Sequence, residues 1–136
     1  MNGTKDTGKT IGEVERLTGI PKRELKYYIE QNIMQPSQRT ESGYWLYSVE
    51  DVQRVRLTAL CRNLDIPVMA VRAILADPVA CWQEELERQI IRLADKSGRT
   101  DAQLRLARRL QGHGAWEALQ IYYDSLTEKD AELTTK

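Results

Sequence analysis

Three side chains between residues 23 and 27 share one face of a helix and carry the chemistry of nucleic-acid binding. Arg23, Lys26 and Tyr27 are spaced three and one residues apart, and Lys22 lies beside them near the start of the same helix. Arginine and lysine bind phosphate oxygens and base edges, and a tyrosine hydroxyl can bind a phosphate alongside them. This face is a candidate for contact with double-stranded DNA. On its own, it fits a solvated helix surface with an incidental tyrosine equally well.

The segments around this face predict a helix-turn-helix. Thr10 and Glu13 form a capping box in front of a first helix, and Gly19 supplies the left-handed residue that ends it. Pro21 then begins a second helix that extends to about Gln31. The apolar positions of the two helices are Ile11, Val14 and Leu17 in the first, and Leu25, Tyr28 and Ile29 in the second. In this motif the second helix is the one that enters a DNA groove.

Residues 37–48 predict a β-hairpin after the second helix, with two short arms around a Glu-Ser-Gly turn. Such a hairpin forms a wing, in which Arg39 can reach a phosphate. Strand alternation places Tyr44 and Leu46 on one face, and Trp45 and Tyr47 on the other. Periodicity does not decide which pair faces the core.

Two further helices complete the predicted domain. Ser48 and Asp51 form an acidic capping box before a third helix, and Pro67 opens a fourth that ends at Asp77-Pro78. The buried stripe of the third helix is Val52, Val55, Leu57, Leu60 and Leu64. We therefore expect a winged helix-turn-helix domain at residues 10–76 that follows a disordered lead at residues 1–9.

Beyond this domain, apolar residues repeat at alternating spacings of four and three, as in a coiled coil. The seam predicts one long helix within residues 77–112, and two helices with a turn at residues 96–99 are the alternative. A lone helix with an apolar seam is unstable in water, so a second copy of the chain is the expected partner. A short tail helix and a frayed end are expected at residues 113–136. The candidate dimerisation residues are Leu86, Ile90, Leu93, Leu104 and Ala107.

The rest of the sequence favours few other functions. The net charge is zero, so the total charge gives no support for DNA binding, and only the placement of the cations supports it. No apolar run approaches the roughly 18 residues of a membrane span, and the N-terminus lacks a secretory signal, which predicts a cytoplasmic chain. Cys61 and Cys81 lie in separate predicted helices, so we expect no disulfide. No arrangement of catalytic residues or phosphate-binding loop is evident, which predicts neither enzymatic activity nor a cofactor.

An effector site is the least determined feature. Cys81 and His113 are too far apart in the sequence for a metal site, so we expect no bound metal. Four aromatic residues in the C-terminal part favour interface packing, with a pocket for a flat apolar compound as the alternative. These residues are Trp82, Trp116, Tyr122 and Tyr123.

Taken together, the motifs of residues 10–76 resemble the mercury-resistance-regulator (MerR) family. The resemblance covers the whole predicted domain, because several motifs occur in the right order and at the right separations. They are Ile11-Gly12-Glu13, Gly19, Arg23, Leu25, Lys26-Tyr27-Tyr28, Gly43-Tyr44, Leu46-Tyr47-Ser48, Glu50-Asp51-Val52 and Arg62-Asn63-Leu64. The chain departs from the family at Trp45, where arginine is frequent, and at Asp65, where glycine is frequent.

This resemblance implies a mainly α-helical regulator that binds a pseudo-palindromic promoter as a homodimer and bends and untwists the promoter spacer. It implies antiparallel pairing of the dimerisation helices, with RNA polymerase as a further expected partner at the same promoter. It also places a metal-sensing thiolate, where one exists, near Cys81. The DNA contacts it implies, together with Lys22 from the helix face, are Arg23, Lys26, Tyr27, Arg39, Tyr44 and Arg62.

One alternative belongs to another class of protein. An architectural or adaptor protein without an inducer could use the same winged domain to bend DNA or to dock a protein. The seam beyond residue 78 argues against it, because a dimerisation helix is expected of a regulator.

Overall fold

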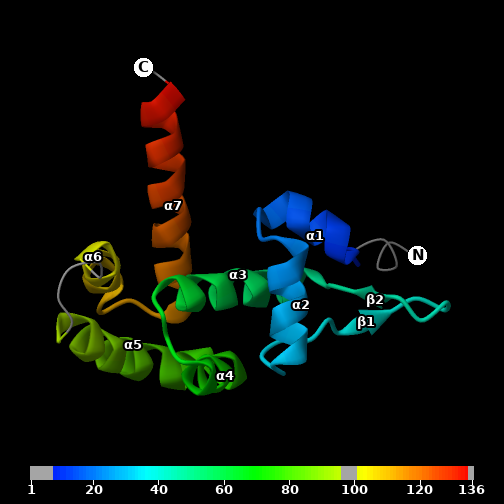
Figure 1. Ribbon diagram of the computed structural model, residues 1–136, viewed down its shortest axis with the longest axis horizontal. Coiled ribbons are helices and arrows are strands. Elements are labelled where there is room, and N and C mark those ends of the chain that lie inside the picture. The colour runs from blue at the N-terminus through cyan, green and yellow to red at the C-terminus, as the bar shows by residue number, and fades with distance from the viewer. Residues whose placement is uncertain (1–7, 96–100, 135–136) are drawn as a thin grey trace. The chain divides into compact units, whose positions relative to one another are not determined.

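The computed structural model describes residues 8–95 and 101–134, with side chains through Thr127 (Figure 1). The fold is mainly α-helical with one small antiparallel hairpin, as predicted. In the described residues the elements are α1 (Ile11–Thr18), α2 (Lys22–Glu30), β1 (Gln38–Arg39), β2 (Trp45–Leu46), α3 (Val49–Asn63), α4 (Val68–Ala76), α5 (Pro78–Ala94), α6 (Asp101–Leu110) and α7 (Ala115–Thr134). They form an N-terminal unit through Ala59 and a C-terminal unit from Leu60 onward.

The N-terminal unit begins with the predicted capping box. Thr10 N–H donates to Glu13 Oε1 at 2.8 Å, Glu13 N–H donates to Thr10 Oγ1 at 3.2 Å, and Gly19 ends α1 in the left-handed conformation with φ 78°. Val14, Leu25 and Tyr28 are buried in the core. Leu17 is half exposed, contrary to the prediction, although it lies three residues after the fully buried Val14. Ile29 is also only partly buried.

The hairpin follows α2 in the predicted segment. β1 and β2 pair with Gln38 opposite Leu46 and Arg39 opposite Trp45, and Gly43 at φ 91° makes the turn. Tyr47 faces the core at 2% exposure, whereas Tyr44 is 72% exposed. Lys9 was expected in the disordered lead, but its N–H and C=O groups pair with Tyr47 in an antiparallel bridge. The two backbone hydrogen bonds of this bridge attach Lys9 to the exit of the hairpin.

The C-terminal unit is built from helices that pack on one another. α4 packs on α5, and α5, α6 and α7 pack pairwise. Trp82 of α5 is fully buried, and Leu110 and Ala118 are buried on α6 and α7. α4 therefore belongs to this unit, although the sequence pattern placed residues 68–76 in the N-terminal domain.

The prediction of one continuous helix within residues 77–112 is wrong. α5 ends at Ala94 with Asp95 as its C-cap, and α6 begins at Asp101 and packs on α5, which agrees with the two-helix alternative. The proposed turn at residues 96–99 lies outside the described residues. The seam is covered by the chain's own helices. Leu86, Ile90, Leu93 and Ala107 are buried and Leu104 is half-buried.

The tail helix is longer than predicted. Gly112 at φ 86° ends α6, and α7 then continues for 20 residues from Ala115. Among the described residues, no helix combines the length and the apolar character that a bilayer span requires.

Candidate nucleic-acid interface

The N-terminus of α2 is held by a carboxylate from α1. Pro21 precedes α2 with extended backbone and has no side chain that could cap the helix. The Lys22 N–H instead donates to Glu15 Oε2 at 3.0 Å. This bond satisfies one of the backbone donors left open at a helix start, and a carboxylate at that end also interacts favourably with the helix dipole. The contact across seven residues was not predicted from the sequence.

α2 presents the predicted cationic face to solvent. Lys22, Arg23 and Lys26 are exposed, and Tyr27 is half-buried between them and the core face that carries Leu25 and Tyr28. Because one face of α2 is buried and the other is exposed, α2 can enter a DNA groove without breaking its contacts with α1.

The wing carries a second cationic group. The Arg39 guanidinium lies 4.2 Å from the centroid of the Trp45 ring, across the register that pairs these two residues. Trp45 remains 43% exposed, so the stacked pair is accessible. A guanidinium above an indole ring loses rotational freedom, but its N–H donors point outward in the guanidinium plane, where they can reach a phosphate. Trp45 thus contacts the wing arginine across the hairpin.

The base of the wing is fixed by one buried carboxylate. Asp51 Oδ2 accepts from Ser37 N–H (2.8 Å) and Ser37 Oγ (2.6 Å) before β1, and from Ser48 N–H (2.9 Å) after β2. Asp51 N–H donates in turn to Ser48 Oγ at 3.0 Å, which completes the predicted capping box. The sequence indicated the Ser48 contact but not the Ser37 contact, which joins residues 14 positions apart. Beside this carboxylate, burial and the charge of Asp51 raise the pKa of Tyr47, which is a core residue.

In the C-terminal unit, the turn after Arg62 is held by side chains from later helices. Asp65 adopts φ 60°, a left-handed conformation that aspartate tolerates, where the family often has glycine. Gln89 of α5, which is 3% exposed, donates to the carbonyls of Leu64 (2.8 Å) and Asp65 (3.1 Å). Gln103 of α6 donates to Asn63 O (3.0 Å) and Asp65 Oδ2 (2.9 Å). Arg62 itself is half-buried at the end of α3, so it is less accessible than the cations of α2.

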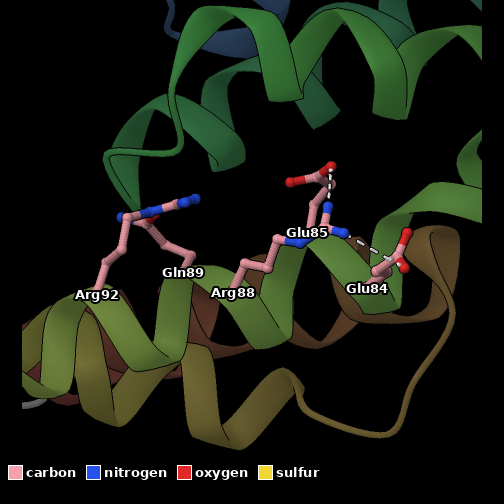
Figure 2. Close-up of polar contacts among 5 residues, drawn as sticks. All are labelled: Glu84, Glu85, Arg88, Gln89 and Arg92. Carbon is pink, nitrogen blue, oxygen red and sulfur yellow. Dashed lines mark hydrogen bonds and ion pairs between the residues drawn. The ribbon is translucent and has the colours of Figure 1, made fainter.

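Beyond the buried Gln89, α5 carries charged side chains that pair with one another. Figure 2 shows Arg88 between Glu84 (3.5 Å) and Glu85 (2.9 Å), and Arg92 Nε beside Gln89 Oε1 (2.7 Å). The Arg88 pairs lie at the surface, where an ion pair contributes little to stability.

Comparison with known proteins identifies the family of the N-terminal half. Residues 9–77 match the MerR HTH family of regulatory proteins. The chain belongs to this family. The match includes α1, α2, the hairpin, α3 and α4, and so covers every predicted DNA contact.

The following relatives of this MerR-family chain are named as transcription regulators. It is 31% identical over 90 residues to the HTH-type transcriptional activator TipA of Streptomyces coelicolor, covering 66% of this chain and 36% of TipA. It is 31% identical over 86 residues to the ZntR homologue of Haemophilus influenzae, an HTH-type transcriptional regulator, covering 63% and 62% of the two chains. Among solved structures, the HTH-type transcriptional regulator SkgA from Caulobacter crescentus is similar with a TM-score of 0.49 and 23% identity, covering 95% of this chain and 82% of SkgA. The MerR-family chain thus spans little more than a third of TipA.

The four aromatic residues proposed as an effector pocket differ widely in exposure. Trp82 is fully buried in the core, Trp116 is 43% exposed, and Tyr122 and Tyr123 are half-buried with their rings edge to face at 5.4 Å.

The cysteines differ in accessibility. Cys61 is buried, which raises the pKa of its thiol to about 12, and Cys81 is half-buried. Within the described residues, no three His, Cys, Asp or Glu side chains are grouped as metal ligands.

Proposed function

We propose that this MerR-family chain is a sequence-specific, DNA-binding transcription regulator that acts as a homodimer on a pseudo-palindromic promoter. In this proposal α2 enters the major groove with Lys22, Arg23, Lys26 and Tyr27, and the hairpin contacts the adjacent backbone with Arg39 and Tyr44. Arg62 contributes from the end of α3. Bending and untwisting of the promoter spacer then alters its use by RNA polymerase, and the site of action is the cytoplasm.

The observation that carries this proposal is the exposed cationic face of α2, held at its N-terminus by Glu15. A recognition helix must present cations without losing its packing, and here Leu25 and Tyr28 keep α2 on the core. The clamp at Asp51 supports the same proposal, because a wing can position a phosphate contact only if its base is held.

The homodimer is supported by the requirements of DNA binding rather than by the seam. Two recognition helices about one helical turn apart, roughly 34 Å, convert weak half-site binding into specific binding. Four of the five seam residues are buried within one chain and Leu104 is half-buried, so the seam does not require a partner. Large apolar side chains that remain exposed in the C-terminal unit offer an alternative surface for a second copy. They are Met69, Val79, Ile91 and Trp116.

Footprinting on the promoters of the neighbouring genes identifies the operator, and fluorescence anisotropy with that duplex tests the interface. We expect Arg23→Ala and Lys26→Ala each to weaken operator binding by about 1–3 kcal/mol while the helical content is unchanged. Arg39→Ala should weaken binding to all sequences alike and reduce the slope of affinity against salt by about one unit.

Arg88→Ala is the matched control, since it removes the same charge from a surface ion pair of the C-terminal unit. It should leave the affinity unchanged. Unchanged affinity in both Arg23→Ala and Lys26→Ala would exclude α2 as the recognition helix.

A second candidate function is an architectural or adaptor protein that binds as a monomer. The burial of the seam within one chain favours it over a dimer held by that seam. Deletion of residues 79–136 would not distinguish the two functions, because α4 packs on α5 and would lose its core. Sedimentation of the intact protein with full-site and half-site duplexes does distinguish them. A regulator binds the full site as two copies with higher affinity, and a monomeric adaptor binds both duplexes equally.

A further inference from the structure

The C-terminal unit contains an open cavity of about 550 Å³ between α6, α7 and the end of α3. This volume is in the range of clefts that bind small molecules. Of the four aromatic residues considered from the sequence, only Tyr122 lines it. The cavity does not involve the cationic face of α2, so an inference about it stands apart from the proposed DNA interface.

The polar lining of the cavity is rich in hydrogen-bond donors and positive charge. Arg105 and Arg109 lie four residues apart on α6, and Tyr122 and Ser125 face them from α7. Arg109 donates one N–H to Ser125 Oγ at 3.3 Å, which leaves most of its five donors available. Tyr122 Oη accepts from Asn63 Nδ2 at 2.8 Å, so its own hydroxyl hydrogen remains available to donate.

The described lining of the cavity is positively charged. Among the residues whose side chains the structure describes, it includes two arginines and no Asp or Glu. The carboxylate of Asp65, which is outside the lining, already accepts from Gln103. Like charges at a spacing of four residues on a helix repel each other, and an anion between them removes that repulsion. Arginine forks match the geometry of a carboxylate in particular.

The remaining wall is apolar. Ala102 and Leu106 of α6 and Leu126 of α7 line the same cavity, and Leu126 is 38% exposed. A ligand that fits both parts has an anionic group for the arginines and a flat or compact apolar body for the leucines.

We propose that this cavity is a binding site for a small organic anion, an aromatic or aliphatic carboxylate, whose carboxylate binds Arg105 and Arg109. Tyr122 and Ser125 donate further hydrogen bonds to it, and its apolar body lies against Leu106 and Leu126. Binding requires neither DNA nor a second chain.

Isothermal titration calorimetry of the full chain with 1-naphthoate tests the site. The neutral and cationic isosteres, 1-naphthylmethanol and 1-naphthylmethylamine, have the same apolar body and no carboxylate. We expect 1-naphthoate to bind one site per chain, and each isostere to bind at least about tenfold more weakly, because a hydrogen bond to a charged group is worth about that factor. Absence of binding, or equal binding of the three probes, overturns the proposal.

Arg105→Gln and Arg109→Gln locate the site, with Arg108→Gln as the matched control. Arg108 is an exposed arginine of the same helix that does not line the cavity. Each lining variant should reduce naphthoate affinity about tenfold, and Arg108→Gln should not change it. An equal loss in all three variants would indicate general attraction to a basic helix and would also overturn the proposal. Because the readout contains no DNA, its result is independent of whether α2 reads an operator.

Discussion

The two units of this MerR-family chain are stabilised in different ways. In the N-terminal unit, polar side chains hold the ends of short elements: Thr10 caps α1, Glu15 holds the start of α2, and Asp51 holds both ends of the hairpin. In the C-terminal unit, apolar side chains of α5 are buried against other helices of the same chain, and Leu86 and Leu93 are each 1% exposed.

This difference shows which sequence patterns identify the group that a residue contacts and which do not. A capping box acts over three residues, so the donor and the acceptor are both known from the sequence. An apolar seam defines a face that must be covered but not what covers it. A second chain and a returning segment of the same chain bury the same area.

The largest expected effect tests where the seam is buried. We expect Leu86→Ala to lower the free energy of unfolding by about 2–5 kcal/mol, because it leaves a cavity in a core closed within one chain. The loss should not depend on protein concentration. Urea unfolding followed by far-UV circular dichroism at two protein concentrations measures it.

Ile91→Ala on the same helix is the control. Ile91 is 63% exposed, so its truncation should change the stability of the single chain by no more than about 0.5 kcal/mol. If Ile91 contributes to a dimer, the loss of stability caused by Ile91→Ala will grow with protein concentration. A concentration-dependent loss in Leu86→Ala would instead restore the seam as the dimer interface.

The second largest effect tests the clamp at the wing. We expect Asp51→Ala to cost about 2–3 kcal/mol, because it leaves the N–H groups of Ser37 and Ser48 without their acceptor at a carboxylate that is 5% exposed. Asp77→Ala is its counterpart in the C-terminal unit, where Asp77 accepts only from Ala80 N–H at the start of α5. A single cap of this kind is worth about 1 kcal/mol. Equal losses in urea unfolding of the two variants would contradict the role of Asp51 as a clamp.

Most of the N-terminal fold could be predicted because its determinants are local. The boxes at Thr10 and Ser48 and the glycines at positions 19 and 43 all act within four residues. The bonds from Glu15 to Lys22 and from Asp51 to Ser37 were missed, because nothing in residue spacing shows that a loop returns to a given carboxylate.

The candidate DNA contacts on α2 followed from spacing alone, since i, i+3 and i+4 positions share a face whatever the tertiary structure. The cavity between α6 and α7 could not be found in this way. Arg105 and Arg109 face Tyr122 and Ser125 only because α5 ends at Ala94 and α6 and α7 pack on it. In this part of the sequence, the apolar seam is the strongest pattern, but its residues pack in the core and do not line the cavity.

A smaller effect compares one backbone position in each unit. Gly19 and Gly112 both adopt positive φ after a helix, and neither has an atom within 4 Å of an added Cβ. We expect Gly19→Ala and Gly112→Ala each to cost about 1 kcal/mol, through backbone strain and not through a clash. Gly114→Ala also enters open space but is not at positive φ, so it should cost less than either in urea unfolding. A cost at Gly114 as large as at Gly19 would contradict the strain argument.

The smallest effect is the pH dependence of the α1 cap. The hydrogen bond from the Thr10 backbone lowers the pKa of Glu13 below its ordinary value of 4.5. Desolvation opposes this shift, and the Thr10 side chain, Lys9 and Arg16 add to it. A group whose pKa is lower in the folded state stabilises that state above its unfolded pKa. The contribution of Glu13 is therefore complete above about pH 5 and is lost as the pH falls through its folded pKa.

Glu13→Gln isolates this contribution, because glutamine keeps the capping contact but does not titrate. The difference in unfolding free energy between the natural chain and Glu13→Gln should be constant at neutral pH and should decrease below about pH 4.5. NMR titration of the Glu13 side-chain carboxyl carbon should give a midpoint below 4.5. A midpoint at or above that value would show that the carboxylate does not accept from the Thr10 N–H in solution. The contrast drawn above, between an N-terminal unit held by polar caps and a C-terminal unit held by apolar burial, would then be weaker.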